Sequence, residues 1–392
     1  MRIAYIELDY HSENLISFCK AFQNSSEDIS IFTTERVYKD VISEGDFTST
    51  HWHIMRDESI NKFLHNYLSD INSHDIIFFA TIESCFYAYS SLKFKPISIL
   101  RIHMLNSFFN RRKSMSFPAN FRELIDWIYY VLNNLIIEKE NLHLKRILNR
   151  INYFTLTHHN IDCHFRSEHP EQIKKLLPII PLSVFDTRYL KQPDAEKIYF
   201  TIPGNIDLQR RDYLLALNVF KNISPFIKKK TQLILLGKPI GYAGRKIIKE
   251  FIRLQTKLLS IKFYTDTVPQ KEFNNQMMLT DVILSPLNTE SKYKIYREKY
   301  GYTKISGNYT DIIRYGKPSI IPVSVPIEDH LKGIIDTYNS KEDLEKILLS
   351  YINGDLLNTR SQNILPALKE FSPEKVRDKT VTIFSSVLES KS

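Results

Sequence analysis

Short apolar runs alternate with amphipathic helical patterns along almost the whole chain, and this alternation restricts the possible folds more than any other feature. The runs are rich in β-branched and aromatic residues and do not alternate polar with apolar positions, which is typical of strands covered on both faces of a parallel sheet. In the first half of the chain the expected strands are RIAYIEL, DISIFTT, HWHIM, HDIIFFATI, KPISILRIHML and NYFTLTHH. Helical patterns such as NLISFCKAF lie between them.

The second half repeats this alternation. Its expected strands are KIYFTIPG, TQLILLG, SIKFYTD, DVILSPL and, as the closing strand, KPSIIPV. A proline-rich stretch between the halves indicates a linker with a boundary near residue 190. We therefore expect an α/β protein with two doubly wound Rossmann-like domains facing a cleft, 1–190 and 191–392, the last helix being a candidate to return to the first domain.

The composition is that of a globular protein, with 43% hydrophobic and 25% charged residues in a chain of 392. The net charge of +9 favours anionic partners, although a basic surface alone also explains it. No zinc signature, RNP-like motif or long basic block supports a nucleic-acid partner. Three widely spaced cysteines, no signal peptide and no run of about 20 apolar residues indicate a cytoplasmic protein, soluble or at the inner face of the cell membrane.

The segment TIPGNIDLQRRDY joins an expected strand to an expected helix. Gly204 permits the turn, and Arg210 and Arg211 lie at the predicted opening of the helix. Arginine binds phosphate in a bidentate manner and keeps its charge, and the amino end of a helix favours anions. The segment therefore predicts a phosphate site, unless it is only an exposed first turn.

Three further loops of the second half carry ligand-binding candidates. Gly237 ends the run LILLG, where a simple turn is an equal explanation. Val268 precedes a helix, where free backbone groups can meet a base edge or only cap the helix. The loop before Gly-Lys-Pro is the strongest candidate, because small residues let a backbone approach phosphate and a carboxylate in the first helical turn can bind sugar hydroxyls. Its candidate residues are Ser306, Gly307, Asn308, Thr310 and Asp311.

The order of strand–GN–RR, strand–G, VP and a small-residue loop with an acid five residues before GKP resembles the nucleotide-sugar domain of GT-B glycosyltransferases. The likeness is greatest to the large retaining family that includes sucrose-phosphate synthase and bacterial mannosyltransferases. It implies that Arg210 and Arg211 hold the diphosphate and that Asp311 binds the ribose. In that family a second acid eight residues upstream contacts the donor sugar, and here Thr303 occupies that position. The resemblance also implies that neither a metal nor a cofactor is needed besides the nucleoside-diphosphate sugar.

The first half is then expected to bind the acceptor and to supply catalytic side chains. His11 follows the first strand, where it could deprotonate an acceptor hydroxyl in an inverting transfer or only help to cap the first helix. His103 follows a later strand, and the resemblance implies a histidine near the donor sugar. Glu83 follows another strand and is the third catalytic candidate.

Residues 108–136 combine Arg111, Arg112 and Lys113 with several aromatic side chains. Basic and aromatic residues on one amphipathic element favour peripheral contact with a membrane surface or a lipid-linked acceptor. The alternative is a helix that packs on its own domain.

Taken together, these patterns favour a glycosyltransferase that moves a sugar from a nucleoside-diphosphate sugar to a glycan or lipid-linked acceptor in bacterial surface polysaccharide synthesis. Two alternatives stay open. One is a sugar-nucleotide epimerase or hydrolase of the same architecture. The other is a non-catalytic or degenerate GT-B binding subunit, which the threonine at position 303 favours.

Overall fold

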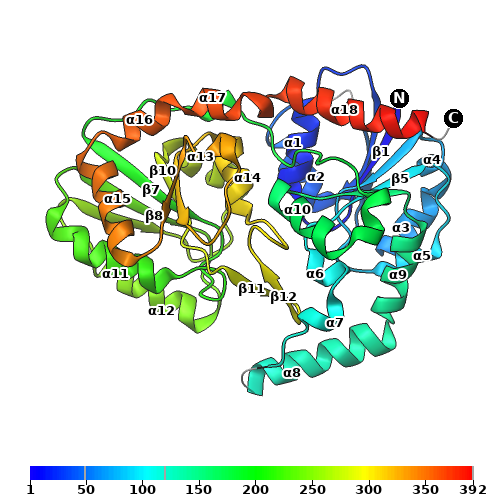
Figure 1. Ribbon diagram of the computed structural model, residues 1–392, viewed down its shortest axis with the longest axis horizontal. Coiled ribbons are helices and arrows are strands. Elements are labelled where there is room, and N and C mark those ends of the chain that lie inside the picture. The colour runs from blue at the N-terminus through cyan, green and yellow to red at the C-terminus, as the bar shows by residue number, and fades with distance from the viewer. Residues whose placement is uncertain (48–49, 119–120, 391–392) are drawn as a thin grey trace. The chain divides into compact units, whose positions relative to one another are not determined.

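The computed structural model describes residues 1–47, 50–118 and 121–390, and Figure 1 shows the path of the chain. The chain divides into two compact units. Unit 1 comprises Met1–Val184, Lys292–Ile305 and Pro373–Ser392, and unit 2 comprises Phe185–Ser291 and Ser306–Ser372. Each unit is built around its own sheet and has its own hydrophobic core.

Unit 1 contains a six-stranded parallel sheet in the order β3-β2-β1-β4-β5-β6. Its strands are β1 (Arg2–Glu7), β2 (Asp28–Thr34), β3 (His51–Met55), β4 (Ile76–Phe79), β5 (Ile97–Arg101) and β6 (Tyr153–Thr155). The central strands β1 and β4 are buried on both faces, which is why their sequences read as continuous apolar runs. This order is doubly wound, so the sheet predicted for the first half is confirmed.

The helices of unit 1 cover both faces of this sheet (Figure 1). They are α1 (Ser12–Phe22), α2 (Glu35–Ile42), α3 (Ile60–Asn66), α4 (Leu68–Ile71), α5 (Phe86–Ser91), α6 (Leu105–Phe108), α7 (Arg111–Ser114), α8 (Phe121–Tyr130), the π-helical η1 (Val131–Ile137), α9 (Glu140–Arg150), α10 (His159–Glu168), the 3-10 turn η2 (Pro170–Lys175) and α18 (Pro373–Glu389). The last of these, α18, lies beside α1, and the ring of its buried Phe384 is 5.7 Å from that of Phe78 in β4.

Unit 2 contains a second six-stranded parallel sheet, in the order β14-β13-β10-β7-β8-β9. Its strands are β7 (Lys197–Pro203), β8 (Lys230–Leu236), β9 (Leu259–Phe263), β10 (Val282–Leu284), β13 (Ser319–Pro322) and β14 (Ile335–Tyr338). Read from β7, this is the same doubly wound order as in unit 1. The sequence patterns did not predict β14, because it is a short strand of mixed burial at the sheet edge. The expected closing strand, KPSIIPV, forms β13.

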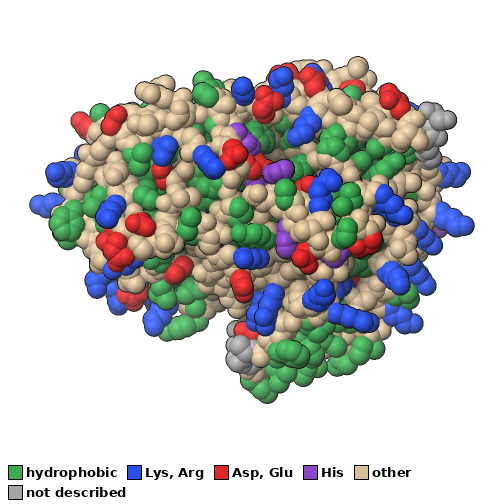
Figure 2. All heavy atoms as spheres, in the orientation of Figure 1, with side chains coloured by type: hydrophobic (Ala, Val, Ile, Leu, Met, Phe, Trp, Pro, Cys, Tyr) green, Lys and Arg blue, Asp and Glu red, His purple; other side chains and the backbone are tan. Residues whose placement is uncertain are grey.

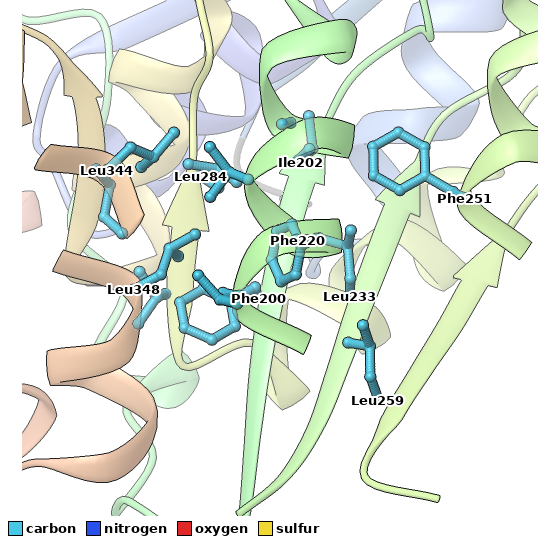
Figure 3. Packing of buried hydrophobic residues seen from close by; sticks show 14 of the residues in the cluster. Phe200, Ile202, Phe220, Leu233, Phe251, Leu259, Leu284, Leu344 and Leu348 are labelled. Atoms are coloured by element: carbon cyan, nitrogen blue, oxygen red, sulfur yellow. The ribbon is translucent and has the colours of Figure 1, made fainter. Parts of the chain in front are cut away.

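One hydrophobic cluster of unit 2 lies between its sheet and the helices of one face, and a second lies on the other face. Figure 3 shows Phe200 and Ile202 of β7 packed beside Phe220, with Leu344 and Leu348 on the other side. The helices and 3-10 turns are η3 (Thr187–Tyr189), α11 (Tyr213–Ile223), η4 (Ser224–Phe226), α12 (Gly241–Ile252), α13 (Gln270–Leu279), α14 (Gly307–Tyr315), η5 (Asp329–Leu331), α15 (Lys341–Asn353), α16 (Leu356–Gln362), α17 (Ile364–Leu368) and η6 (Lys369–Phe371).

A hairpin from the second half of the sequence belongs to unit 1. It consists of β11 (Glu290–Tyr293), which starts in unit 2, and β12 (Tyr296–Lys299). Within unit 1, Ile295 and Tyr296 are buried against Tyr130 at the end of α8. This excursion departs from the contiguous division at residue 190, because 292–305 find their apolar partners in unit 1.

Candidate active site

Polar side chains gather in unit 1 where the neighbouring strands β1, β4 and β5 end. His11 lies just beyond β1, Glu83 follows β4, and His103 follows β5. Because these strands are parallel and adjacent, their carboxyl ends meet at one edge of the sheet, which is where doubly wound folds bind ligands. The structure therefore brings the three catalytic candidates of the sequence into one cluster.

His11 is at the centre of this cluster. Its Nδ1 lies 3.0 Å from Oε1 of Glu13, and its Nε2 lies 3.4 Å from Oε1 of Glu83. The ring stacks on that of His103, with centroids 4.9 Å apart and planes 2° from parallel. Nε2 of His103 lies 2.9 Å from the carbonyl oxygen of Ala80, so this nitrogen carries the proton of the neutral ring. His11 thus has a carboxylate at each ring nitrogen, whereas His103 has a neutral acceptor.

Glu83 is only 5% exposed and is held from several directions. The hydroxyl groups of Tyr10 and Tyr293 both donate to its Oε2, the latter over 2.8 Å. Its backbone N–H donates to Asp9, 3.2 Å away, and its carbonyl oxygen accepts from Nζ of Lys294 at 2.9 Å. The carboxylate has almost no freedom to rotate.

These contacts separate the charge states of the cluster. Burial opposes charge on both groups. The hydrogen bonds to Glu13 and Glu83, with the charge of Glu13, nevertheless raise the pKa of His11 well above its ordinary value. The hydrogen bond and charge of His11, with the hydrogen bond from Tyr10, lower the pKa of Glu83 to about 2. Burial, together with the charges of His11 and Arg101, lowers the pKa of His103 well below its ordinary value. At neutral pH the site therefore contains an imidazolium between two carboxylates and, stacked on it, a neutral imidazole.

A buried glutamate lies at this edge of the sheet, at the end of β1. Glu7, the last residue of β1, has no exposed surface, and burial raises the pKa of its carboxyl to about 7. Its Oε1 accepts a hydrogen bond of 3.0 Å from the backbone N–H of Asp9. Glu7 therefore fixes the turn that leads into His11.

A second candidate region lies in unit 2, where β7 ends. Arg211 is 7% exposed and donates from Nη2 to Oδ1 of Asn308 over 2.9 Å and from Nη1 to the carbonyl oxygen of Asn205 over 3.2 Å. Its Nε has no hydrogen-bond partner, and no carboxylate pairs with it, among the residues that the structure describes. A buried guanidinium that only neutral groups contact favours an anionic ligand.

Gly204 lies directly beside this guanidinium, and Gly237 lies against the backbone of Gly204. Gly204 has φ +93°, and a Cβ atom there would lie 2.7 Å from Nη2 of Arg211. A Cβ on Gly237 would lie 2.4 Å from the carbonyl oxygen of Gly204. Gly204 requires glycine because of its positive φ, and Gly237 requires glycine because backbone atoms fill the space of a Cβ.

The two predicted arginines have different surroundings. Arg210 is exposed, with its Nε 3.6 Å from Oδ2 of Asp207, whereas Arg211 is buried. The expectation that both open a helix is wrong, because α11 begins at Tyr213. Asp212 accepts a hydrogen bond from the backbone N–H of Leu215 and caps that helix, so the arginines lie in the preceding loop.

The loop before Gly-Lys-Pro forms the amino end of α14. Ser306 is its cap and accepts from the backbone N–H of Asn308, whose side chain also donates to Oγ of Ser285 over 2.6 Å. Gly307 is exposed, and Thr310 donates to the carbonyl oxygen of Gly307 over 2.7 Å. Asn308 thus contacts Arg211 directly, and Ser306 holds the backbone of Asn308.

One expectation for this part of the chain needs correction. Asp311 was placed in the first turn of its helix, but the cap at Ser306 starts α14 at Gly307, so Asp311 is the fifth residue and half-buried. Thr303, at the position of the upstream acid, lies in unit 1, where its hydroxyl accepts from the backbone N–H of Lys299 over 2.7 Å. Val268 packs partly buried on the apolar cluster beside α13, just ahead of that helix.

Some side chains of the unit 1 cluster were not predicted from the sequence, among them Tyr10, Tyr293 and Lys294. Tyr10 could have been predicted from the sequence, because it directly precedes His11. Tyr293 is 210 positions from Glu83, in the other half of the chain, and no local pattern indicates that contact.

Compared by sequence, the chain matches no protein-family model and no curated protein. Solved structures are similar over nearly its whole length. A glycosyltransferase from Rickettsia africae ESF-5 matches with a TM-score of 0.59 and 12% identity over 99% of this chain and 98% of its own. WaaG, a glycosyltransferase involved in lipopolysaccharide biosynthesis, matches with 0.59 and 11% over 98% and 99%.

An α,α-trehalose-phosphate synthase (UDP-forming) from Burkholderia xenovorans also matches, with a TM-score of 0.60 and 8% identity over 98% of this chain and all of its own. These proteins are GT-B glycosyltransferases. Identities this low bear on the fold alone, and the fold agrees with the two doubly wound sheets described above. The chain has the GT-B glycosyltransferase fold.

Proposed function

We propose that this protein is a glycosyltransferase that moves a sugar from a nucleoside-diphosphate sugar to a glycan or lipid-linked acceptor in the synthesis of bacterial surface polysaccharide. The observation that carries the proposal is the buried guanidinium of Arg211, which has no carboxylate partner among the described residues and lies beside Gly204. A diphosphate supplies the missing negative charge. The GT-B fold supports the reaction class.

The donor is proposed to bind to unit 2. Arg211 would hold the diphosphate, with Gly204 and the amino end of α14 beside it. In the transfer, the acceptor oxygen forms a bond to the anomeric carbon while the bond from that carbon to the diphosphate breaks. The electron pair leaves with the nucleoside diphosphate, whose growing charge a preorganised guanidinium stabilises. Asp311 is the proposed ribose ligand, and Arg210 a secondary phosphate contact.

The acceptor is proposed to bind to unit 1, with His11 as the base in an inverting transfer. Neutral His11 accepts the hydroxyl proton, and Glu83 and Glu13 stabilise the imidazolium that results. Because these carboxylates raise the pKa of His11, the fraction of competent enzyme increases as pH rises through that value. His103 stays neutral and is proposed to lie near the donor sugar.

A non-catalytic binding subunit is the second candidate, and one observation favours it. Thr303 replaces the acid that resembling enzymes direct at the donor sugar, and it takes part in a turn of unit 1 instead. Such a protein would still bind a nucleoside diphosphate through Arg211. Only a measurement of turnover therefore distinguishes a binding subunit from a glycosyltransferase.

Peripheral membrane contact is proposed for the arm, which we define as α8 and η1 (Phe121–Ile137). Its large exposed side chains recur at helical spacing and form one face: Phe121, Leu124, Ile125, Ile128, Tyr129, Leu132, Ile136 and Ile137. Trp127, Val131 and Leu135 on the opposite face pack against Tyr130 and Tyr296. An amphipathic helix with an uncovered apolar face suits the boundary between lipid headgroups and acyl chains.

The charges around the arm favour an anionic bilayer. Exposed Arg112 and Lys113 precede it, and exposed Lys139, Lys145 and Arg146 follow it. Figure 2 shows hydrophobic side chains gathered along α8 with Lys and Arg side chains in a row above them. No helix among the described residues is long and apolar enough to cross a membrane, so the proposed contact is monotopic.

A release assay tests the transfer. The protein is incubated with UDP-glucose, UDP-galactose, UDP-N-acetylglucosamine or GDP-mannose, with and without a bacterial lipid-linked oligosaccharide extract, and free nucleoside diphosphate is measured. We expect release from one donor that requires the extract and is lost in His11→Gln. Donor binding without release, in the presence of extract, would favour the binding subunit.

A further inference from the structure

The tip of the β11–β12 hairpin lies against Glu83. The hydroxyl of Tyr293 donates to Oε2 of Glu83 over 2.8 Å, and Nζ of Lys294 donates to the carbonyl oxygen of Glu83 over 2.9 Å. One residue therefore restrains the side chain of Glu83 and the next restrains its backbone. Because Oε2 is occupied, Oε1 is left to face Nε2 of His11.

Lys294 also reaches a buried anchor at the base of the arm. Its Nζ is 3.6 Å from Oε1 of Glu140, which is 3% exposed. Glu140 is itself fixed by Nη2 of Arg111 at 2.7 Å and by the hydroxyl of Tyr130 at 2.8 Å. The ammonium of Lys294 thus ties the loop that carries Glu83 to a rigid buried ion pair.

Backbone strain is concentrated at the same place. Among the described residues, the non-glycine positions with positive φ are Cys85 at 51°, Lys139 at 50° and Lys294 at 53°. A left-handed backbone is unfavourable for any residue other than glycine. Cys85 lies two residues after Glu83, Lys139 directly precedes Glu140, and Lys294 bridges the two. Lys294 is therefore strained itself and contacts two segments that each contain a strained residue, and strain of this kind is typical of functional sites.

We propose that Tyr293 and Lys294 are positioning residues that hold the Glu83 carboxylate against His11. This inference rests on the proposed function only in naming His11 as the base; the contacts themselves do not depend on it. Tyr293 sets the rotation of the carboxylate, and Lys294 sets the position of the loop. The hairpin thereby gives the second half of the chain a role in the acceptor site of the first.

The charge state of His11 reports on this arrangement without any turnover. The groups that face His11 or Glu83 are Glu7, Asp9, Tyr10, Glu13, His103, Tyr293 and Lys294. Of these, the Glu83 carboxylate contributes one of the two hydrogen bonds that raise the pKa of His11. If the carboxylate turns away, that contribution is lost while the contact with Glu13 remains.

The test is an NMR titration of the full chain labelled with 13C at histidine Cε1, in which His11→Gln identifies the His11 signal. We expect the pKa of His11 to fall by about 0.5–1 unit in Tyr293→Phe and in Lys294→Met. Lys294→Arg should restore most of the original value, because arginine also donates to the carbonyl oxygen. Lys292→Met, one residue before the pair, removes a contact to Glu123 and should leave the titration unchanged.

An unchanged His11 titration in folded Tyr293→Phe would overturn the proposal, and so would a shift of equal size in Lys292→Met. If Lys294→Met does not fold, Tyr293→Phe, which keeps its ring, decides alone. If sugar transfer is also measured, kcat should fall in Tyr293→Phe with little change in KM for the donor. An absence of transfer in wild-type protein would contradict the proposed function and leave the titration result standing.

Discussion

Nη2 of Arg211 donates a hydrogen bond of 2.9 Å to Oδ1 of Asn308, 97 positions further along the chain. The contact joins the loop after β7 to the amino end of α14. Asn308 is held in turn by Ser285 beyond β10, so elements from three neighbouring strands define the guanidinium position. A neutral amide orients the arginine while leaving its positive charge unopposed.

Asn308→Asp should therefore weaken nucleoside-diphosphate binding. The new carboxylate keeps the acceptor oxygen for Arg211 but neutralises the guanidinium, so we expect the affinity to fall about ten- to hundredfold, the equivalent of one charged hydrogen bond. The melting temperature should stay the same or rise. Calorimetric titration with UDP and GDP measures the first effect and thermal unfolding the second. Unchanged affinity would show that the anion does not bind at Arg211.

Gly237→Ala should destabilise unit 2. The added Cβ would lie 2.4 Å from the carbonyl oxygen of Gly204 and 2.8 Å from the backbone nitrogen of Asn205, and backbone atoms cannot move aside cheaply. We expect the free energy of unfolding to fall by about 1–3 kcal/mol, measured by urea denaturation. Gly307→Ala is the matched control, since nothing lies within 4 Å of a Cβ there and the residue opens a helix. Equal losses in both variants would contradict the steric account.

Glu7→Gln should flatten the dependence of stability on pH. Burial raises the pKa of this carboxyl from 4.5 to about 7, so the folded protein binds the proton more tightly than the unfolded chain does. That stabilisation is complete below pH 4.5 and disappears as pH rises through 7, a change of roughly 3 kcal/mol. Glutamine does not titrate, so the variant should gain stability relative to wild type between pH 5 and pH 8. The test is calorimetric unfolding of wild type and Glu7→Gln at pH 5 and pH 8. If Glu7 were ionised throughout, the difference in stability between the two proteins would be the same at both pH values, which would contradict the prediction.

Replacing Tyr129 and Ile136 together by serine should weaken binding to phosphatidylglycerol vesicles. The double variant removes two large side chains from the exposed face of the arm, and we expect the partition coefficient to fall at least tenfold. Leu365→Ser, at an equally exposed leucine of α17, is the control. Co-sedimentation at low and high salt separates the apolar contribution from the basic one. If the control behaves like the double variant, the arm is not the contact.

The doubly wound sheets could be predicted because buried parallel strands appear as continuous apolar runs. The proximity of His11, Glu83 and His103 follows from the same pattern, since residues that directly follow adjacent parallel strands must share one edge. The hairpin could not be predicted in this way. Tyr293 and Lys294 find their partner 210 positions away or more, and the pattern of β11 and β12 contains no signal for packing on the first half.

In unit 2, the features that could not be predicted from the sequence concern single residues and the start of one helix. Arg210 and Arg211 are adjacent in the sequence and chemically identical, so only the fold decides that one is buried and the other exposed. Asp311 was misplaced by one turn because Ser306, two residues before Asn308, caps the helix earlier than expected. Helix starts of this kind depend on which small polar residue accepts the first free backbone N–H.

Whether a nucleoside diphosphate binds at Arg211 is measured by calorimetric titration of wild-type protein, Arg211→Ala and the exposed control Arg253→Ala with a panel of nucleoside diphosphates. We expect wild type and Arg253→Ala to bind one of UDP, GDP, ADP, CDP or dTDP with equal affinity. Arg211→Ala should bind it at least tenfold more weakly, and Arg210→Ala should lose less. Failure of wild-type protein to bind any of them, or unaltered binding in Arg211→Ala, would contradict the account.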